Sequence, residues 1–425
     1  MQDWLLLARN RHFLLLWLAM LVSATGTFFL LLAVSANLIR VHGSGVGAAS
    51  VFAFQWILPV LLVSTIRRIC ETVGLRRAIV TSDLGGAVLS LSIGLLLMHG
   101  WVVPVLGCFL LRGFVEAITK TSRVVLVKYL FEGRQLELAS STFNLSYYLG
   151  GVLGGVLGSM LVSRVSLLGV AAISAATFAF SASCYALLPD VRPQRRAVPV
   201  RRGVIASAVG AAARHRALFR AFGYLCIATG VFQGFHNAAR TILPIRAMSL
   251  SDTAVMQLQI VSGIAIVLGA LAVSLIPRLV RLGGFGFCVN LLASASVYAA
   301  TLAHTRAQML GLYFGFIFLF ELAFTAAQSR LIQASEPEDI VTLTAGSNAI
   351  GTGLLIAFAL LSGWLADLMP FQRVGLLVAG CGVVLGLALE LAGHLLYADA
   401  ARRASVPGPA DGIGGRRVDP GAGPS

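Results

Sequence analysis

The chain has 425 residues, of which 58% are hydrophobic and only 12% are charged, with a formal net charge of +15. A soluble globular protein carries about twice that share of charged residues, so the composition excludes an ordinary soluble domain. The basic residues lie in short segments between long apolar blocks. That pattern is typical of a membrane topology signal, and it argues against a nucleic-acid partner.

Twelve apolar blocks follow one another, each close to the roughly 20 residues that a membrane-spanning helix needs. Inside a bilayer every backbone polar group must be satisfied within the protein, and the blocks are too long and too continuously apolar for barrel strands. We therefore predict helices. The expected spans are 13–36, 46–66, 78–98, 101–122, 140–162, 166–188, 217–241, 253–276, 284–303, 308–332, 341–366 and 374–397. The first is read as a retained span rather than a signal peptide, because no early cleavage site interrupts it.

A basic loop divides the spans six and six. We predict an N-terminal six-helix bundle at 1–189, a cytoplasmic basic linker at 190–216, a C-terminal six-helix bundle at 217–397 and a disordered cytoplasmic tail at 398–425. With both termini inside, most of the 32 basic residues fall on the inner side, which fixes the orientation in a bacterial inner membrane. Within the linker, residues 204–213 form either a short helix on the lipid surface or part of a solvated loop.

The six cysteines are scattered singly, and no metal-ligand spacing occurs. We expect no disulfide framework, no metal site and no cofactor.

Span four is the most polar block. Arg112, Glu116, Thr119, Lys120 and Arg123 recur along one helical face. Arg112 and Glu116 stand near mid-membrane at the i,i+4 spacing that allows a direct pair. Charges at that depth are costly and usually face a cavity or a partner, so the pair is either a proton-coupling site or a permanent, self-neutralising ion pair.

Span seven carries Gln233, His236, Asn237 and Arg240 on one face, which we predict to contact substrate. His236 is a candidate for proton handling, although a hydrogen-bonded packing role is the commoner fate of a lone membrane histidine.

Span ten places Glu321, Thr325 and Gln328 on one face. Glu321 has no cation beside it in its own helix, so it is the second candidate for proton coupling. Asp83, which could pair with Lys120 or Arg123, and Glu390 lie near the inner membrane surface, where structural roles are expected. Span five carries glycines at four-residue spacing, which allows close helix packing and could also serve a sliding, gating contact.

These features resemble the major facilitator superfamily, whose members have twelve spans as six plus six. The family motif between spans two and three is matched in part by Glu71, Gly74, Arg76 and Arg77, while Arg67 and Thr72 depart from it. Arg112 fits the arginine of the span-four motif, with Glu116 in place of its glycine. Gly154, Gly155 and Gly158 follow the span-five exporter motif without its proline.

The resemblance implies an all-α membrane protein of the major facilitator fold, with a cavity lined by spans one, four, seven and ten, and gating by the two glycine-containing motifs. We expect a monomeric, proton-coupled exporter of a small amphipathic or metal-chelating metabolite, similar to bacterial siderophore and drug exporters. The alternatives are an importer or facilitator of an anionic metabolite that uses Arg112 and Arg240, a sensor or scaffold that does not transport, and a membrane enzyme. The isolated histidines and the lack of paired acids in loops argue against an enzyme.

Overall fold

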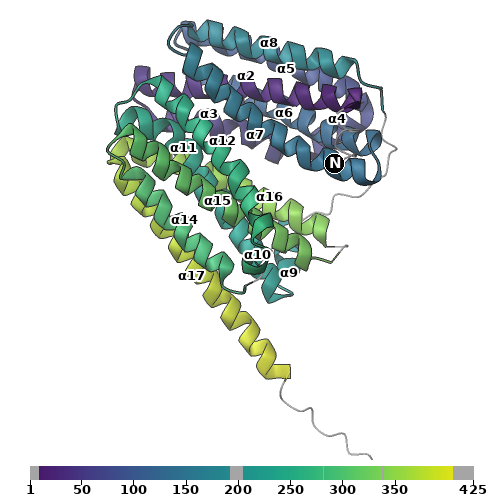
Figure 1. The fold of residues 1–425 in the computed structure, drawn as a ribbon, viewed down its shortest axis with the longest axis vertical. Helices are drawn as coiled ribbons and strands as arrows, with labels where there is room; N and C mark the ends of the chain where they lie inside the picture. Colours follow the sequence, from purple (N-terminus) through teal and green to yellow (C-terminus); the bar gives the residue numbers. More distant parts are fainter. Residues whose placement is uncertain (1–8, 192–203, 281, 337–338, 405–425) are drawn as a thin grey trace, which may run out of the picture.

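The computed structural model describes residues 9–191, 204–280, 282–336 and 339–404, and every regular element within them is helical (Figure 1). The prediction of an all-helical membrane protein is confirmed. The first half of the chain forms α2 (Arg11–His42), α3 (Gly45–Leu61), α4 (Val63–Val73), α5 (Leu75–Met98), α6 (Val102–Leu130), α7 (Gly133–Leu161) and α8 (Leu167–Ala186). The second half forms α9 (Val204–Ala212), α10 (Arg216–Ile227), η1 (Ala228–Phe232), α11 (Gln233–Ile242), η2 (Leu243–Ala247), α12 (Asp252–Leu275), α13 (Pro277–Val280), α14 (Phe285–Thr301), α15 (Arg306–Ala334), α16 (Ile340–Leu368) and α17 (Phe371–Ala404).

Among the described residues, nine helices are long and apolar enough to cross a membrane, and the bent pair α3 and α4 supplies a tenth candidate. Two shorter apolar helices cover Leu145–Leu161 and Phe285–Thr301. The bend between α3 and α4 is 69°. Pro59 lies in the turn before the break and removes a backbone donor, which weakens the helix there.

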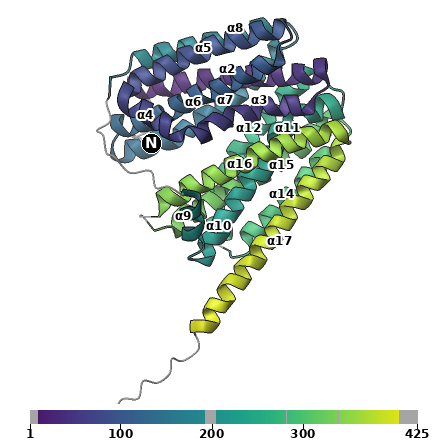
Figure 2. The same ribbon diagram turned by 180° about the vertical axis from the view of Figure 1, so that it is seen from behind.

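The helices gather in two groups (Figures 1 and 2). Helices α2 to α8 lie side by side in one, and α10 to α17 lie side by side in the other. The two groups touch mainly through α7 on α12 and α3 on α16. In Figure 1 they meet at one end and diverge toward the end that holds the N-terminus and α9.

At the end where the groups meet, residues from both halves of the chain form what we call the latch: Arg40, Gly45, Arg246, Asp252 and Asp367. Arg40 Nε donates to Asp252 at 2.5 Å, and Arg246 pairs with Asp367. The Asp367 carboxylate also accepts the backbone N–H of Gly45 at 2.7 Å, at the N-terminus of α3, where a negative charge is favoured. Two further hydrogen bonds between the groups lie toward this end: Ser35 Oγ donates to Thr241 Oγ1 at 3.0 Å, and Arg246 donates to the Gly43 carbonyl oxygen at 3.2 Å.

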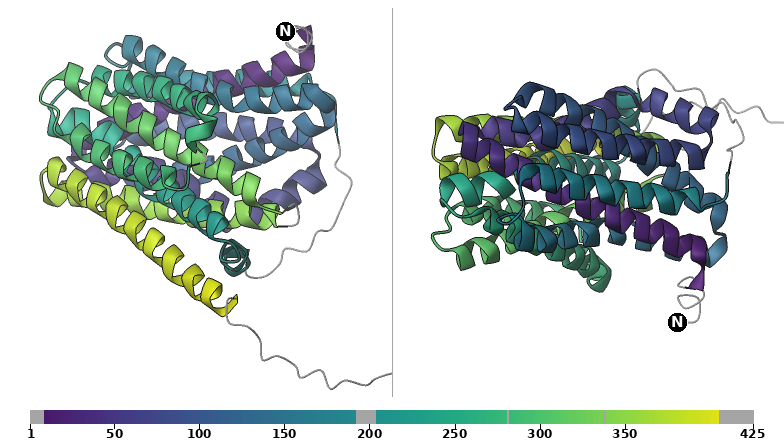
Figure 3. Two further views of the ribbon diagram at one scale, coloured as in Figure 1. Left: turned by 60° about the horizontal axis from the view of Figure 1, so that its bottom comes forward. Right: turned by 90° about the horizontal axis from the view of Figure 1, so that it is seen from above.

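The structure corrects the prediction at the C-terminus. Helix α17 runs to Ala404, so the predicted tail boundary at 398 falls inside a helix. Alanine has the best intrinsic helix propensity, and Ala398, Ala400 and Ala401 extend the helix beyond the apolar block, as the left view of Figure 3 shows. The remainder of the predicted tail, 405–425, lies outside the described residues, as does linker segment 192–203. Within the linker, α9 forms and packs against α16.

Candidate functional site

A cavity of about 250 Å³ lies between the two groups of helices. Its walls come from α2, α3, α6 and α7 on one side and from α11, α12 and α15 on the other. They consist of Phe28, Leu31, Phe52, Gln55, Trp56, Pro59, Gly113, Glu116, Ala117, Lys120, Tyr147, Tyr148, Gly151, Gln233, His236, Asn237, Arg240, Gln259, Gly263, Ile266, Phe320, Glu321 and Phe324. Six predicted residues therefore meet here, although they come from three helices far apart in sequence: Glu116, Gln233, His236, Asn237, Arg240 and Glu321.

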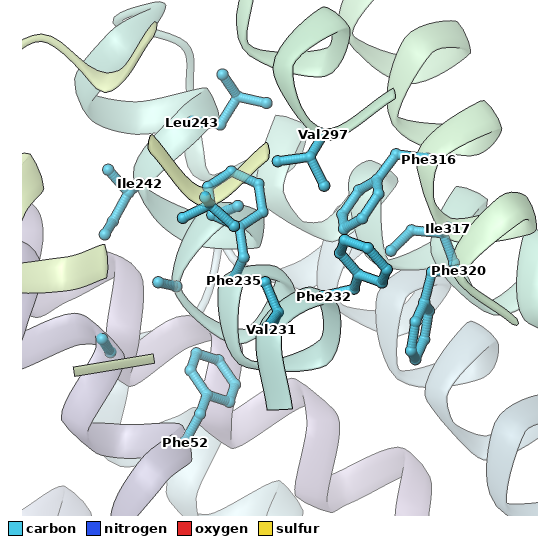
Figure 4. Close-up of a cluster of buried hydrophobic side chains, with 14 of the residues drawn as sticks. Phe52, Val231, Phe232, Phe235, Ile242, Leu243, Val297, Phe316, Ile317 and Phe320 are labelled. Carbon is cyan, nitrogen blue, oxygen red and sulfur yellow. The ribbon is translucent and has the colours of Figure 1, made fainter. Parts of the chain in front are cut away.

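Helix α11 presents its polar residues to the cavity because its opposite face is apolar. Phe235 stacks on Phe371, with ring centroids 5.6 Å apart, and meets Phe316 edge-on at 5.9 Å. Figure 4 shows this cluster, with Phe232 and Phe235 facing Phe316 and Ile317 of α15. The π-helical segments η1 and η2 precede and follow α11 directly. Such segments are frequent at functional sites and shift the register of the residues between them.

Arg240 is a buried cation without a buried acid beside it. Its side chain is 5% exposed, and its guanidinium carbon lies 3.6 Å from the centroid of the Phe52 ring. Its Nη2 donates to Asn237 at 3.0 Å and its Nη1 to Gln259 at 3.5 Å, while Nε has no hydrogen-bond partner. No described carboxylate lies within ion-pair distance. A neutral amide shell around a buried cation leaves its charge available to a ligand in the cavity.

His236 is held by a tyrosine. Its Nδ1 lies 2.8 Å from the Tyr313 hydroxyl, which also donates to the His236 carbonyl oxygen at 3.4 Å. Both side chains are buried. The hydrogen bond fixes the imidazole ring at the cavity wall, in agreement with the packing interpretation of a lone membrane histidine.

The Arg112–Glu116 pair predicted from sequence is replaced by another. Glu116 pairs with Lys120 at 2.8 Å, one turn further along α6. The Lys120 ammonium lies between two rings, 5.1 Å from the centroid of Trp56 and 4.7 Å from that of Tyr147. Such contacts favour a cation. Lys120, Trp56 and Tyr147 were not predicted as site residues.

Arg112 points away from this cavity. It is fully buried, donates to Thr27 at 3.0 Å and lies 5.0 Å from the Phe178 ring centroid. Glu116 is four residues from Arg112 and four from Lys120, so helical spacing allows either pair. Tertiary contacts decide between them, because the Arg112 side chain is held by Thr27 of α2 and Phe178 of α8. Arg112 lies on the stripe with Thr119 and Arg123, which are also buried.

Glu321 lies at the cavity wall on α15, 5% exposed, and its Oε1 accepts a hydrogen bond from Thr325 at 2.9 Å. No described cation is within ion-pair distance. Thr325 therefore contacts the carboxyl from behind rather than lining the cavity, and Gln328 is exposed one turn further along. Neither is among the residues that border the cavity.

The glycines of α7 allow close contacts with α12 in the other group and with α2 in their own. A Cβ added at Gly155 would lie 2.7 Å from the Met256 carbonyl oxygen on α12, and one at Gly158 would meet the Met256 side chain. A Cβ at Gly154 would lie 2.7 Å from the Thr25 carbonyl oxygen on α2. Only glycine permits these approaches.

The other predicted gating residues lie at the divergent end. Gly74 joins α4 to α5 at a φ of 89°, which favours glycine, and Arg76 donates to the Leu188 carbonyl oxygen at 3.2 Å within its own group. Arg77 is exposed, and the side chain of Glu71 lies outside the described residues.

Two groups of apolar helices around a central polar and aromatic cavity define the class of protein: a multi-pass membrane transporter. The chain belongs to the Major Facilitator Superfamily, whose family model matches residues 16–339. No curated protein matches the chain.

Solved structures share the fold at low sequence identity. The nucleoside transporter NupG is 15% identical with a TM-score of 0.72, covering 90% of this chain and 99% of its own. A POT family transporter in complex with 5-aminolevulinic acid is 11% identical with a TM-score of 0.72, covering 91% and 97%. A bacterial homologue of the human lysosomal transporter Spinster is 11% identical with a TM-score of 0.68, covering 93% and 98%. The family and fold are those of secondary transporters, which are generally not enzymes.

Proposed function

We propose that the chain is a proton-coupled exporter of a small amphipathic or metal-chelating metabolite, such as a siderophore or drug. It would act as a monomer in the bacterial inner membrane, with twelve spans in two six-helix bundles and both termini cytoplasmic. The observation that carries the proposal is Glu321: a buried carboxyl, without a described cation beside it, at the wall of the central cavity. A carboxyl in that position can bind either a proton or a positively charged ligand group.

Alternating access is supported by the unequal ends of the molecule. The latch closes one end through the Arg40–Asp252 pair and the bonds of Asp367 to Gly45 and of Arg246 to the Gly43 carbonyl oxygen, whereas the helices diverge at the other. With the termini inside, this conformation opens toward the cytoplasm. Breaking the latch and closing the other end would carry the cavity contents across the membrane, as expected for two bundles that rock about a central site.

The cavity walls indicate what the substrate carries. Phe28, Phe52, Trp56, Tyr148 and Phe324 offer aromatic surface for an apolar or planar body. Lys120 is already neutralised by Glu116, so Arg240 is the cation that remains for an anionic group. We therefore favour an amphipathic substrate with at least one anionic group.

The coupling test uses inside-out membrane vesicles that hold a proton gradient reported by a pH-sensitive dye. Siderophores, drugs, organic anions, nucleosides and peptides are added in turn, and a transported compound releases protons. We expect Glu321→Gln to abolish that release while substrate binding persists, because the amide cannot exchange a proton. Glu336→Gln, at an exposed acid, is the matched control. Substrate-driven proton flux that survives both Glu116→Gln and Glu321→Gln would refute the coupling.

The alternative is an importer or facilitator of an anionic metabolite, and the unpaired charge of Arg240 is the observation that favours it. In that case uptake into right-side-out vesicles continues after the proton gradient is collapsed. Arg240→Glu abolishes it, and Glu321→Gln has little effect. The two functions thus differ in which single substitution stops transport.

A further inference from the structure

A second, smaller cavity lies inside the N-terminal group, which we call the inner chamber. Its volume is about 10 Å³, and it is lined by Ser23, Ala24, Thr27, Asp83, Glu116, Thr119, Arg123, Tyr147 and Phe178. Most of these side chains are polar. A polar space of this size is near the lower limit for one water molecule, which makes water its natural occupant. Glu116 and Tyr147 line both this chamber and the central cavity, so they form the wall between the two.

Asp83 of α5 lines the chamber between α6 and α8. Its side chain is 2% exposed, and its two carboxyl oxygens accept hydrogen bonds from Thr119 at 3.0 Å and Ser181 at 2.6 Å. The pair with Lys120 or Arg123 expected from sequence is absent among the described residues. Lys120 pairs with Glu116, and Arg123 donates to the Tyr185 hydroxyl at 3.3 Å. Two neutral hydroxyl donors can accommodate either the ionised or the protonated carboxyl.

Arg112 borders the same space through its contacts. Arg112 donates a hydrogen bond to Thr27 and lies over the ring of Phe178, and both of these residues line the chamber. Its Nε and Nη1 form no hydrogen bond although the side chain is fully buried. Buried guanidinium donors are costly when unsatisfied, so water and a nearby carboxylate are their expected partners. The chamber therefore combines two carboxyls, a donor-rich wall and room for water.

We propose that Asp83 is a second proton-binding site, connected to Glu116 through water in the inner chamber. This rests on the proposed proton coupling and adds a location for the proton that no substrate in the central cavity can reach. Proton transfer requires donor and acceptor within hydrogen-bond distance or one water apart. Both carboxyls line the chamber, and its volume of about 10 Å³ is that of a single water site.

The transfer balances without any further reactant. The Asp83 carboxyl gives its proton to water, and the water passes a proton to the Glu116 carboxylate. Asp83 becomes ionised, Glu116 becomes neutral and loses its ion pair with Lys120, and the net charge around the chamber is unchanged. The charged and titratable groups that face Asp83 are Arg123 and Glu116 from α6 and Tyr185 from α8. Tyr147 of α7 lines the same chamber, Arg112 of α6 borders it, and α2 contributes the hydroxyls of Ser23 and Thr27.

Protonation of Asp83 can be tested by infrared difference spectroscopy on the purified full-length protein in lipid. The probe is the proton itself. Between alkaline and acidic buffer, a protonated-carboxyl band should appear that is lost in Asp83→Asn and displaced in Ser181→Ala, which removes one hydrogen bond. If Asp83→Asn does not fold, the displaced band in Ser181→Ala still assigns the signal to Asp83. Glu390→Gln, at an acid bonded to Arg220 in the other group, should leave the band unchanged.

A pH jump tests the route. Protonation of Asp83 should slow on the order of 100-fold in Glu116→Gln, because a positioned proton carrier is removed. Asp83 that stays ionised at every pH, or that is protonated at the same rate in Glu116→Gln, would overturn the proposal. Because no substrate is present, this result is independent of the vesicle test at Glu321, and either proposal can fail alone.

Discussion

Arg240 illustrates how a residue found from sequence acquires a specific chemistry from its neighbours. The polar face of its helix predicted a place in the cavity, and the structure surrounds its guanidinium with an aromatic ring and two amides. A planar guanidinium on an aromatic face keeps its edge free for a bidentate contact with a carboxylate or phosphate, which an ammonium cannot reproduce.

We expect Arg240→Ala to raise the KM for an anionic substrate by about 10- to 100-fold, the range of a lost hydrogen bond to a charged group. Arg240→Lys should recover only part of the affinity. Transport kinetics in vesicles would measure both. Arg373→Ala, outside the cavity, serves as the control, and an unchanged KM in Arg240→Ala would remove Arg240 from the site.

At the scale of elements, helix α7 is adapted to two neighbours at once. Gly154 faces α2 in its own group, whereas Gly155 faces α12 across the interface. The exporter-like glycine motif thus coincides with the contact between the two groups. Close approach is possible there because α7 carries no side chain at these positions.

Gly155→Val should disfavour the conformation described here, because a Cβ would meet the backbone carbonyl of Met256 at 2.7 Å. A cysteine placed at Gln259 in the central cavity would then react less with an impermeant thiol reagent supplied from the divergent end. Gly107→Ala, with nothing within 4 Å of the added Cβ, is the matched control. Equal reactivity in Gly155→Val and the wild type would contradict a role for this contact in gating.

For the whole molecule, the latch joins residues more than 200 positions apart: Arg40 pairs with Asp252, and Asp367 accepts the backbone N–H of Gly45. The Arg246–Asp367 pair lies within the second group and holds Asp367 in place. The pairs are partly exposed, with side-chain exposures of 24% to 42%, so each contributes modestly. Asp367 accepts its hydrogen bond from the N-terminus of α3. Together these interactions favour one conformation of the molecule but leave the other accessible.

Asp367→Asn should weaken the latch by about 1 kcal/mol, or roughly fivefold in the ratio of the two conformations. Distance measurements between spin labels on the latch ends of α3 and α16 would show a larger open population. Asp339→Asn, in an ion pair with Arg214 that lies within one group, should leave the distances unchanged. An identical distribution in Asp367→Asn and the wild type would exclude the latch as a conformational determinant.

Local sequence was sufficient to predict helical spans and the polar faces of α6, α11 and α15, because hydropathy and helical periodicity depend on neighbouring residues alone. That is why Glu116, Arg240 and Glu321 were found. The partners were decided by tertiary structure. Glu116 pairs with Lys120 because Arg112 is held by Thr27 of α2 and Phe178 of α8. Asp83 accepts from Ser181 rather than pairing with a cation because α8 lies beside α5. Which side chains share a cavity depends on the packing of helices distant in the chain, and no periodicity within one helix contains that information.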